Sequence, residues 1–354
     1  MPLNDVPGEQ QAAAAPAVSS RTEVMTRLFG YIRGLHATYV MDLGVQLGLF
    51  TALAAAPREP EELAAALGLH PFYVRKWCET AYSLELLEWA RGQGYLLGPH
   101  IGDLLANPDH TYYMGGFPTI HLRVAEDYAH YAQRFRDGGT KPYQAHDSAF
   151  FGAVADGLRT LPLMLLDVLA AELPGVQEKM QAGGHLLDIG CGAGAAVCEF
   201  AARFPALHCL GVDVEPQSLQ LARTAIAARG LGDRAAVQQV AADAPYPDNF
   251  DLATMFLVLH ELDPAIKGSV LRRCHAALRP GGLLLILDEA YPDSQAGLRD
   301  AAVAFSVMAQ WFEMTWGNVV NTRAEIQGML AAAGFGLLAE THLSRFYIVV
   351  AEKR

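Results

Sequence analysis

The sequence predicts an α/β protein in which a helical N-terminal region precedes a doubly wound, mostly parallel sheet. Two observations carry this prediction. From residue 183 onward, short apolar runs alternate with amphipathic stretches, and strands separated by helices favour a parallel sheet. Between residues 21 and 180 the pattern is instead mostly helical. We therefore expect helices and sheet to occupy different parts of the chain.

The predicted sheet has seven strands, and its last two are antiparallel because only a few residues join them. The expected strands are 185–189, 208–212, 235–241, 250–258, 283–287, 336–342 and 346–351. The expected helices between them are 195–203, 216–229, 264–278 and 322–333. Asp263 followed by Pro264 predicts the N-cap and first residue of the third helix. The resulting architecture is Rossmann-like.

The chain divides into four predicted regions. Residues 1–20 are rich in Ala, Pro and Gln and predict a disordered lead-in without the features of a signal peptide. Residues 21–108 predict a winged-helix-like dimerisation domain, and 109–180 predict a helical linker whose paired glycines allow a mobile substrate lid. Residues 181–354 form the sheet domain. The elements expected in the second region are helices over 41–50, 61–67 and 71–87 and a hairpin over 87–97.

Charge and cysteine content exclude several classes of function. The formal net charge is −12, whereas binding to nucleic acid needs a basic face. The helix over 71–87 carries only Arg75 and Lys76 against Glu79 and Glu85, so hydrophobic N-terminal helices predict a homodimer rather than DNA binding. Five cysteines without a CxxC pair favour reduced thiols and a cytoplasmic location. No stretch of about 20 apolar residues predicts a membrane span.

The strand over 185–189 runs into a glycine-rich turn that carries Asp188, Gly190, Gly192 and Gly194. Glycines at the carboxyl end of a parallel strand let the backbone approach a ligand closely. A dinucleotide fingerprint would read GxGxxG and aim a helix N-terminus at a pyrophosphate. Here the spacing is GxGxG, and the acid would repel a pyrophosphate while attracting a cationic or ammonium group. The turn therefore argues against a nucleotide-dependent oxidoreductase.

Two further acids follow the next two strands. Asp213 ends the second strand, where a carboxylate can accept hydrogen bonds from ribose hydroxyls. Asp243 follows the third strand and is placed to meet an adenine amine. Acids on successive strand ends favour an adenosine-containing ligand that also carries a positive charge, such as S-adenosylmethionine.

These motifs give the chain a clear resemblance. The segments 187–194, 211–213, 242–244, 250–251 and 278–282 look like the ordered motifs of class I S-adenosylmethionine-dependent methyltransferases. The region 44–97 placed before them resembles the small-molecule O-methyltransferase family that carries a winged-helix dimerisation domain. The resemblance covers nearly the whole chain beyond residue 20. It implies S-adenosylmethionine as the cofactor, with Val214, Ala244 and Phe256 also near it.

The segment after the fourth strand contains His260 and Glu261, and it is similar to the family's Leu-His-Asp-Trp stretch. The resemblance implies that His260 is the general base that takes a hydroxyl proton during in-line methyl transfer. In the family, acids flank this histidine from the next strand and from a later loop. Asp288 and Glu289 fill the first position, whereas the loop over 316–322 offers amides. Glu313 is the nearby acid that would supply the missing carboxylate.

Aromatic and polar residues predict the substrate pocket. The set is Tyr113, His146, Met308, Trp311, Phe312 and Trp316. The favoured reading is O-methylation of a small secondary metabolite. One alternative is C-methylation of a 2-oxo acid or a prenyl-type substrate, assisted by a divalent metal with His260 as one ligand. A non-enzyme alternative is a regulator that senses the cofactor through its winged helix.

Overall fold

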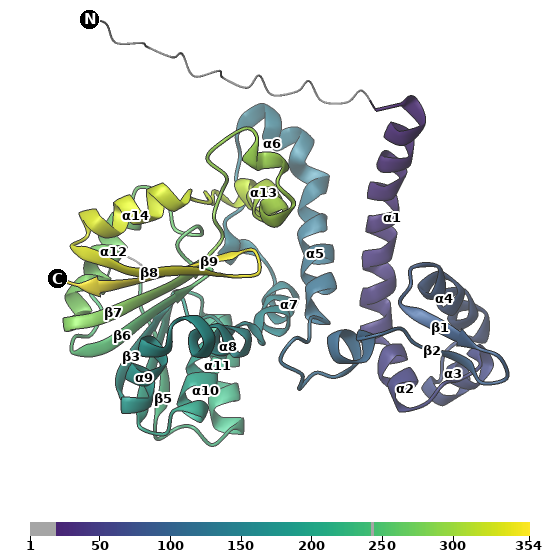
Figure 1. The fold of residues 1–354 in the computed structure, drawn as a ribbon, viewed down its shortest axis with the longest axis horizontal. Coiled ribbons are helices and arrows are strands. Elements are labelled where there is room, and N and C mark those ends of the chain that lie inside the picture. The colour runs from purple at the N-terminus through teal and green to yellow at the C-terminus, as the bar shows by residue number, and fades with distance from the viewer. Residues whose placement is uncertain (1–18, 242–243) are drawn as a thin grey trace, which may run out of the picture.

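The computed structural model describes residues 19–241 and 244–354. Most of the predicted lead-in, and Asp243 with its predicted adenine contact, lie outside the described residues. The chain begins with a long helix that carries a small helical unit and a hairpin, continues through a group of helices and ends in a seven-stranded sheet (Figure 1).

Helix α1 spans Arg21–Gln46 and begins with a capping box, in which the Ser20 and Glu23 side chains bond reciprocally to main-chain N–H groups. The chain then turns at Gly48, which has a φ of 70°, and α2 follows over Leu49–Ala55. The single helix predicted over 41–50 is therefore wrong in its bounds. Gly48 adopts the left-handed conformation that ends one helix and starts another.

Two more helices and a hairpin follow in the predicted order. Helix α3 spans Pro60–Leu67, α4 spans Pro71–Ser83, and the antiparallel strands β1 and β2 span Leu87–Ala90 and Gly94–Leu97. Helix α4 ends before the predicted residue 87 because Glu85 has a positive φ of 62°. Phe50, Leu63 and Trp77 form the core of this unit, and the Trp77 Nε1 donates to the Val40 carbonyl of α1 over 2.9 Å.

The middle of the chain is helical, as predicted, and residues 138–142 form a loop within it. A short π-helical turn over Gly102–Ala106 and brief 3-10 turns accompany the longer helices. These helices are α5 (Gly116–Asp127), α6 (Tyr131–Asp137), α7 (Ser148–Leu158), α8 (Leu161–Glu172) and α9 (Pro174–Ala182).

The stretch Ser148–Glu172 is long and apolar enough, by length and composition, to resemble a membrane span, and so is the bent pair α1–α2. The expectation that the chain has no such stretch was therefore too strict. Ser148–Glu172 is the pair α7–α8, and Phe151 and Leu165 from it are buried in the protein interior. Packing inside the protein accounts for the apolar composition of this stretch.

The sheet has the order β5-β4-β3-β6-β7-β9-β8, with β9 antiparallel to both of its neighbours and the other pairs parallel. This confirms the predicted seven-stranded, doubly wound architecture. The strands are β3 (Gly184–Ile189), β4 (Leu207–Asp213), β5 (Ala235–Gln239), β6 (Phe250–Phe256), β7 (Leu278–Asp288), β8 (Phe335–Leu343) and β9 (Phe346–Lys353). The helices are α10 (Ala195–Arg203), α11 (Pro216–Ala228), α12 (Lys267–Ala277), α13 (Ala304–Glu313) and α14 (Arg323–Ala332).

Two boundaries of the sheet domain differ from prediction by three residues or more. Helix α12 begins at Lys267 rather than Pro264, because Asp263 closes a turn of its own. The Asp263 carboxylate accepts from the Ala265 N–H over 2.8 Å, and the Asp263 main-chain carbonyl accepts from the Ile266 N–H over 2.9 Å. Strand β7 begins at Leu278, so residues 279–282, expected as a loop, belong to the strand beside an irregularity in its pairing with β6.

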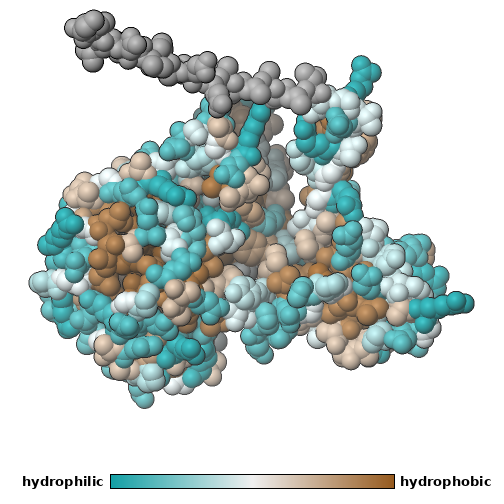
Figure 2. All heavy atoms as spheres, viewed as in Figure 1, coloured by the Kyte–Doolittle hydropathy of each residue, from teal (hydrophilic) through white to brown (hydrophobic). Residues whose placement is uncertain are grey.

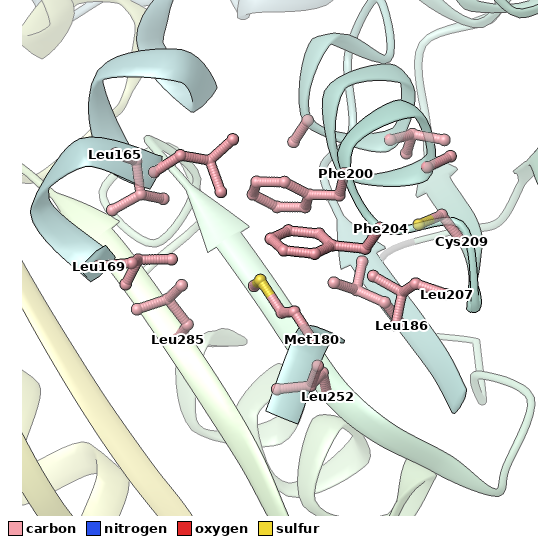
Figure 3. Packing of buried hydrophobic residues seen from close by; sticks show 14 of the residues in the cluster. Leu165, Leu169, Met180, Leu186, Phe200, Phe204, Leu207, Cys209, Leu252 and Leu285 are labelled. Atoms are coloured by element: carbon pink, nitrogen blue, oxygen red, sulfur yellow. The ribbon is translucent and has the colours of Figure 1, made fainter. Parts of the chain in front are cut away.

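The sheet is buried on both faces. Leu186 and Leu187 are consecutive in β3, so their side chains point to opposite faces, and both are fully buried in separate hydrophobic clusters. Figure 3 shows one of these clusters, in which Phe200 from α10 and Phe204, just after that helix, approach Leu165 and other side chains from α8 and the sheet. Continuous burial explains why central strands such as β6 and β9 are apolar runs, whereas the edge strands β5 and β8 are partly exposed and more polar.

Candidate active site

A cavity of about 770 Å³ lies at the carboxyl ends of β3, β4 and β6. In an open parallel sheet this is the edge where ligands bind. The opposite wall comes from α5, α7 and α13, and from the loop at residues 140–144. The site predicted from the glycine turn and the site predicted around His260 therefore form a single cavity.

The glycines of the turn have different tasks. Gly190 and Gly192 line the cavity, with φ values of 68° and 51°. A Cβ on Gly190 would overlap the side chain of Val258, whereas a Cβ on Gly192 would meet no atom within 4 Å. Gly194 is the N-cap of α10 and packs near Ala222 instead of lining the cavity, which corrects its assignment to the cofactor. Gly192 is thus the position that keeps space open for a ligand.

Asp188 places a buried carboxyl group at the cavity wall. Its Oδ1 accepts a hydrogen bond from the Thr254 Oγ1 over 2.7 Å. Burial raises the pKa of Asp188 to about 7, although the Thr254 hydroxyl opposes the shift. A cationic ligand would favour the ionised form. Sequence reasoning missed Thr254, which is paired with Asp188 across the β3–β6 register.

Asp213 fastens the turn to the following segment. Its Oδ2 accepts from the Gly192 N–H over 2.7 Å, and its Oδ1 accepts from the Glu215 N–H over 2.9 Å. Each carboxylate oxygen retains a second lone pair for a ligand hydroxyl. Burial raises the pKa of Asp213, against the opposing effect of these main-chain bonds. Val214 and Phe256 line the cavity as predicted, but Ala244 does not.

His260 follows β6 and lies buried between two carboxylates. Its Nδ1 pairs with Asp288, whose Oδ2 also accepts from the His260 main-chain N–H over 3.1 Å. Its Nε2 lies 3.1 Å from the Glu313 Oε2. Glu313 in turn accepts from the Asn318 Nδ2 over 3.0 Å. Glu313 therefore occupies the position that the loop over 316–322 left without an acid.

Asp288 and Glu313 dominate the electrostatic surroundings of His260. Burial by itself would lower the pKa of His260, but Asp288 and Glu313 outweigh it and raise the pKa well above its ordinary value. Glu261 lies at the cavity wall beside them, and burial raises its pKa to about 8, although His260 opposes the shift. The site therefore holds protons that solvent-exposed groups of the same types would release at lower pH.

Glu289 does not contact His260, although it follows Asp288 directly. Its carboxylate accepts from the Ser306 hydroxyl and pairs with the Arg345 Nε over 3.1 Å. Burial raises its pKa, and the Arg345 guanidinium opposes that shift. Glu289 is thus separated from the predicted catalytic group and belongs to a second polar cluster in the same cavity.

The predicted substrate residues on α13 and in the turn after it fall into two groups, those that line the cavity and those that do not. Phe312 and Trp316 line the cavity. Met308 and Trp311 point away from it and are 51% and 44% exposed, which corrects their assignment to the pocket. Met308 and Phe312 are four residues apart and share a helix face by spacing, so only the tertiary packing shows which side chain lines the cavity.

Tyr113 and His146 also lie outside the cavity lining. Tyr113 is buried with the Arg159 guanidinium 4.6 Å from its ring centre. The His146 Nε2 is 2.8 Å from the Asp127 Oδ2, which also accepts from the Trp316 Nε1 over 2.9 Å. His146 is therefore part of a buried network that ties α5 to the segment after α13, rather than a substrate contact.

Several lining residues were not among the predicted site residues. Tyr143 and Phe151 come from the middle region, His121 comes from α5, and Arg345 comes from the β8–β9 turn. No local pattern marks any of them as a site residue. Within the described residues, no group of three or more His, Cys, Asp or Glu side chains is arranged to hold a metal ion.

Comparison with known proteins adds independent findings. A family model described as a methyltransferase domain matches residues 187–284. The chain is 29% identical to the 3-hydroxy-5-methyl-1-naphthoate 3-O-methyltransferase of Streptomyces sahachiroi over 329 residues, which cover 87% of this chain and 89% of the relative. It is 33% identical to the aclacinomycin 10-hydroxylase of Streptomyces purpurascens over 174 residues, covering 49% of this chain and 45% of the relative.

A solved structure shares the fold. It is an O-methyltransferase from neocarzinostatin biosynthesis in complex with S-adenosylmethionine and 2-hydroxy-5-methyl naphthoic acid. Its sequence is 20% identical, and the superposition has a TM-score of 0.63, covering 90% of this chain and 96% of that chain.

The cavity suits S-adenosylmethionine as the cofactor. The open space at Gly192 admits a ligand against the backbone, and the carboxylates of Asp188 and Asp213 suit its positive charges and hydroxyls. These features agree with the matched family model and the full-length relative. The chain is similar over most of its length to small-molecule O-methyltransferases, and it is a methyltransferase.

Proposed function

We propose that this enzyme methylates a hydroxyl oxygen of a small aromatic acceptor and that His260 takes the hydroxyl proton. The observation that carries the proposal is the position of His260 on the wall of the same cavity as Asp188 and Gly192. The Streptomyces sahachiroi relative, whose printed activity is O-methylation of a naphthoate, supports the choice of oxygen.

The bound cofactor supplies an electrophilic methyl group. Asp188, Asp213 and Gly192 would hold it at the ends of β3 and β4. The acceptor lies against the opposite wall, where Phe151, Phe312 and Trp316 provide an apolar surface. Aromatic side chains of this kind favour a flat ring and exclude water. The protein thus contributes mainly by holding two reactants in line.

His260 is oriented for proton transfer by Asp288. The Asp288 carboxylate accepts from Nδ1–H, and protonated Nε2 donates to Glu313, so Nε2 is the nitrogen that must lose its proton before the ring can act as the base. Because Asp288 and Glu313 outweigh burial and raise the pKa of His260, the free enzyme holds this ring as an imidazolium up to a higher pH than an exposed histidine would. The base form appears as the pH increases, so methyl transfer becomes faster with pH. After transfer, the adjacent carboxylates stabilise the imidazolium that forms.

The buried network around Asp127 closes the acceptor side of the cavity. The Asp127 carboxylate accepts from the Lys141 Nζ over 3.0 Å and from the Trp316 Nε1, and it is also hydrogen-bonded to the His146 Nε2. These bonds lower the pKa of Asp127 to about 2, although burial opposes the shift. They fasten the loop at 138–146 to α5 and to a cavity-lining tryptophan. We assign residues 138–146 as the lid that admits the acceptor, consistent with the predicted role of the middle region.

We also propose that a second copy of the chain packs against α1. Large apolar side chains of this helix are exposed, including Phe29 at 64%, Tyr31 at 67% and Ile32 at 54%. Figure 2 also shows apolar residues at the surface of the N-terminal region. A helix that is apolar on its solvent side needs a partner. DNA is a poor occupant, because Arg75 and Lys76 of α4 are already paired with acids.

The first experiment measures methyl transfer from labelled S-adenosylmethionine to a panel of naphthols, 2-oxo acids and prenyl diphosphates. We expect transfer to a naphthol hydroxyl, unaffected by a chelator and lost in His260→Ala. Transfer to a carbon atom that a chelator abolishes would contradict the proposal, and so would an oxygenated product without methyl transfer, the type of activity printed for the hydroxylase relative. S-adenosylhomocysteine binding, measured by calorimetry, shows that the variant retains its cofactor site.

A further inference from the structure

The turn between β8 and β9 inserts a cation into the aromatic wall of the cavity. Figure 1 shows the closed end of this hairpin reaching toward α5. The Arg345 guanidinium lies 3.6 Å from the ring centre of Phe305 on α13 and 5.3 Å from that of Phe117 on α5. Aromatic faces on several sides hold the guanidinium plane in place. Among the described residues that line the cavity, Arg345 is the one arginine or lysine.

The hydrogen bonds of Arg345 are incomplete. Its Nε donates to Glu289 over 3.1 Å, and Ser306 completes the bonding of that carboxylate. Within the described part of the chain, the Nη1 and Nη2 nitrogens have no hydrogen-bond partner. Because Arg345 lines the cavity, these unused N–H donors are available to a molecule bound there.

A second unused polar group lies next to the same aromatic side chains. The Nε2 of His121 is buried and has no hydrogen-bond partner, and its ring lies 5.3 Å from that of Phe305. Burial, and then the Arg345 charge, lower the pKa of His121 to about 4, so the ring is neutral at pH 7. A neutral imidazole has one N–H donor. A buried polar atom without a partner is costly unless a ligand satisfies it.

Charge decides which chemical group suits these donors. Glu289 already balances the Arg345 charge. The rest of the cavity is acidic, with lining carboxyl groups that include Asp188, Asp213, Glu261 and Glu313. The cavity disfavours additional negative charge, because burial raises the pKa of Asp188 to about 7 and that of Glu261 to about 8. A carboxylate on the acceptor would therefore bind less favourably than a neutral group. A carbonyl oxygen accepts the same hydrogen bonds without adding charge.

We propose that Arg345 and His121 hold a carbonyl oxygen on the acceptor, so that the enzyme selects aromatic hydroxyl compounds that bear a neutral carbonyl group over the corresponding carboxylates. This inference rests on the proposed O-methylation, because it names the acceptor class of that same site. It also separates this enzyme from the naphthoate-methylating relative.

The test compares three probes that share one ring system: 6-acetyl-2-naphthol, 6-hydroxy-2-naphthoate and 2-naphthol. We would measure kcat/KM for each, and also Kd by calorimetry with S-adenosylhomocysteine bound. Hydrogen bonds to a charged donor predict that the acetyl compound is preferred over 2-naphthol by about tenfold to hundredfold. The naphthoate is expected to be the poorest of the three.

Two variants assign the preference to the named residues. Arg345→Lys keeps a cation beside Glu289 but removes the Nη fork, and His121→Phe keeps a ring of similar size without nitrogen. Each is expected to reduce the acetyl preference by about tenfold. Arg159→Lys is the matched control, because this arginine stacks on Tyr113 outside the cavity.

The outcomes separate this inference from the proposed function. An acetyl preference that both variants retain would overturn the inference, as would preferred binding of the naphthoate or no measurable binding of any probe. If no probe is methylated while the acetyl compound still binds best and the variants remove its advantage in Kd, the carbonyl site stands and O-methylation of these naphthols is rejected.

Discussion

Substituting Gly190 by alanine is expected to destabilise the methyltransferase domain by about 2–5 kcal/mol. The φ of 68° places this residue in the left-handed region, where a Cβ costs about 1–2 kcal/mol. That Cβ would lie 2.9 Å from the Val258 Cγ1 and closer still to Cγ2. Val258 is buried and β-branched, so it cannot rotate away easily. Overpacking of this kind adds roughly 1–3 kcal/mol.

Gly192→Ala is the matched control. Its φ of 51° carries a similar conformational cost, but its Cβ meets no atom within 4 Å, so only about 1–2 kcal/mol is expected. The added methyl group instead occupies space in the cavity that Gly192 lines. We therefore expect Gly192→Ala to weaken S-adenosylhomocysteine binding while it retains most of the stability.

Urea unfolding of the ligand-free protein measures the stability terms, and calorimetric titration measures the binding term. A double-mutant cycle with Val258→Ala isolates the steric part, because removing the valine methyl groups relieves the overlap at Gly190. The cycle should show a coupling of about 1–3 kcal/mol. Equal losses of stability in Gly190→Ala and Gly192→Ala, together with no coupling to Val258, would refute this account of the turn.

Three further expectations concern the site and the assembly. His260→Ala should lower kcat by about 10²–10⁴-fold in a methyl-transfer assay, with unchanged S-adenosylhomocysteine affinity; a loss of less than tenfold would argue against general-base catalysis. Glu313→Gln removes one of the carboxylates that raise the pKa of His260. The acidic limb of the pH profile of kcat/KM should therefore move to lower pH. A move to higher pH would contradict the assignment of His260 as the base. Ile32→Asp on exposed α1 should convert a dimer to a monomer in light scattering; a monomeric wild type would reject the dimer.

Much of the fold was predictable because its signals are local. Apolar runs and amphipathic stretches alternate within a few residues, so the seven strands and most of the helices between them could be assigned in order. The glycine spacing after Asp188 likewise lies within a single turn. Helix boundaries were less accurate where a single residue overrides the pattern, as Asp263 does at the start of α12 and Glu85 does at the end of α4.

The active site depended more strongly on tertiary structure. The sequence by itself determined the cofactor turn and singled out His260, because both lie at strand ends that a parallel sheet brings to one edge. Only the folded chain decided which acid completes the histidine's surroundings. Glu313 contacts its Nε2, whereas Glu289 turns to Arg345. Only the fold could show that Arg345 and His121 share a cavity, since packing between a hairpin and two helices leaves no local pattern in the sequence.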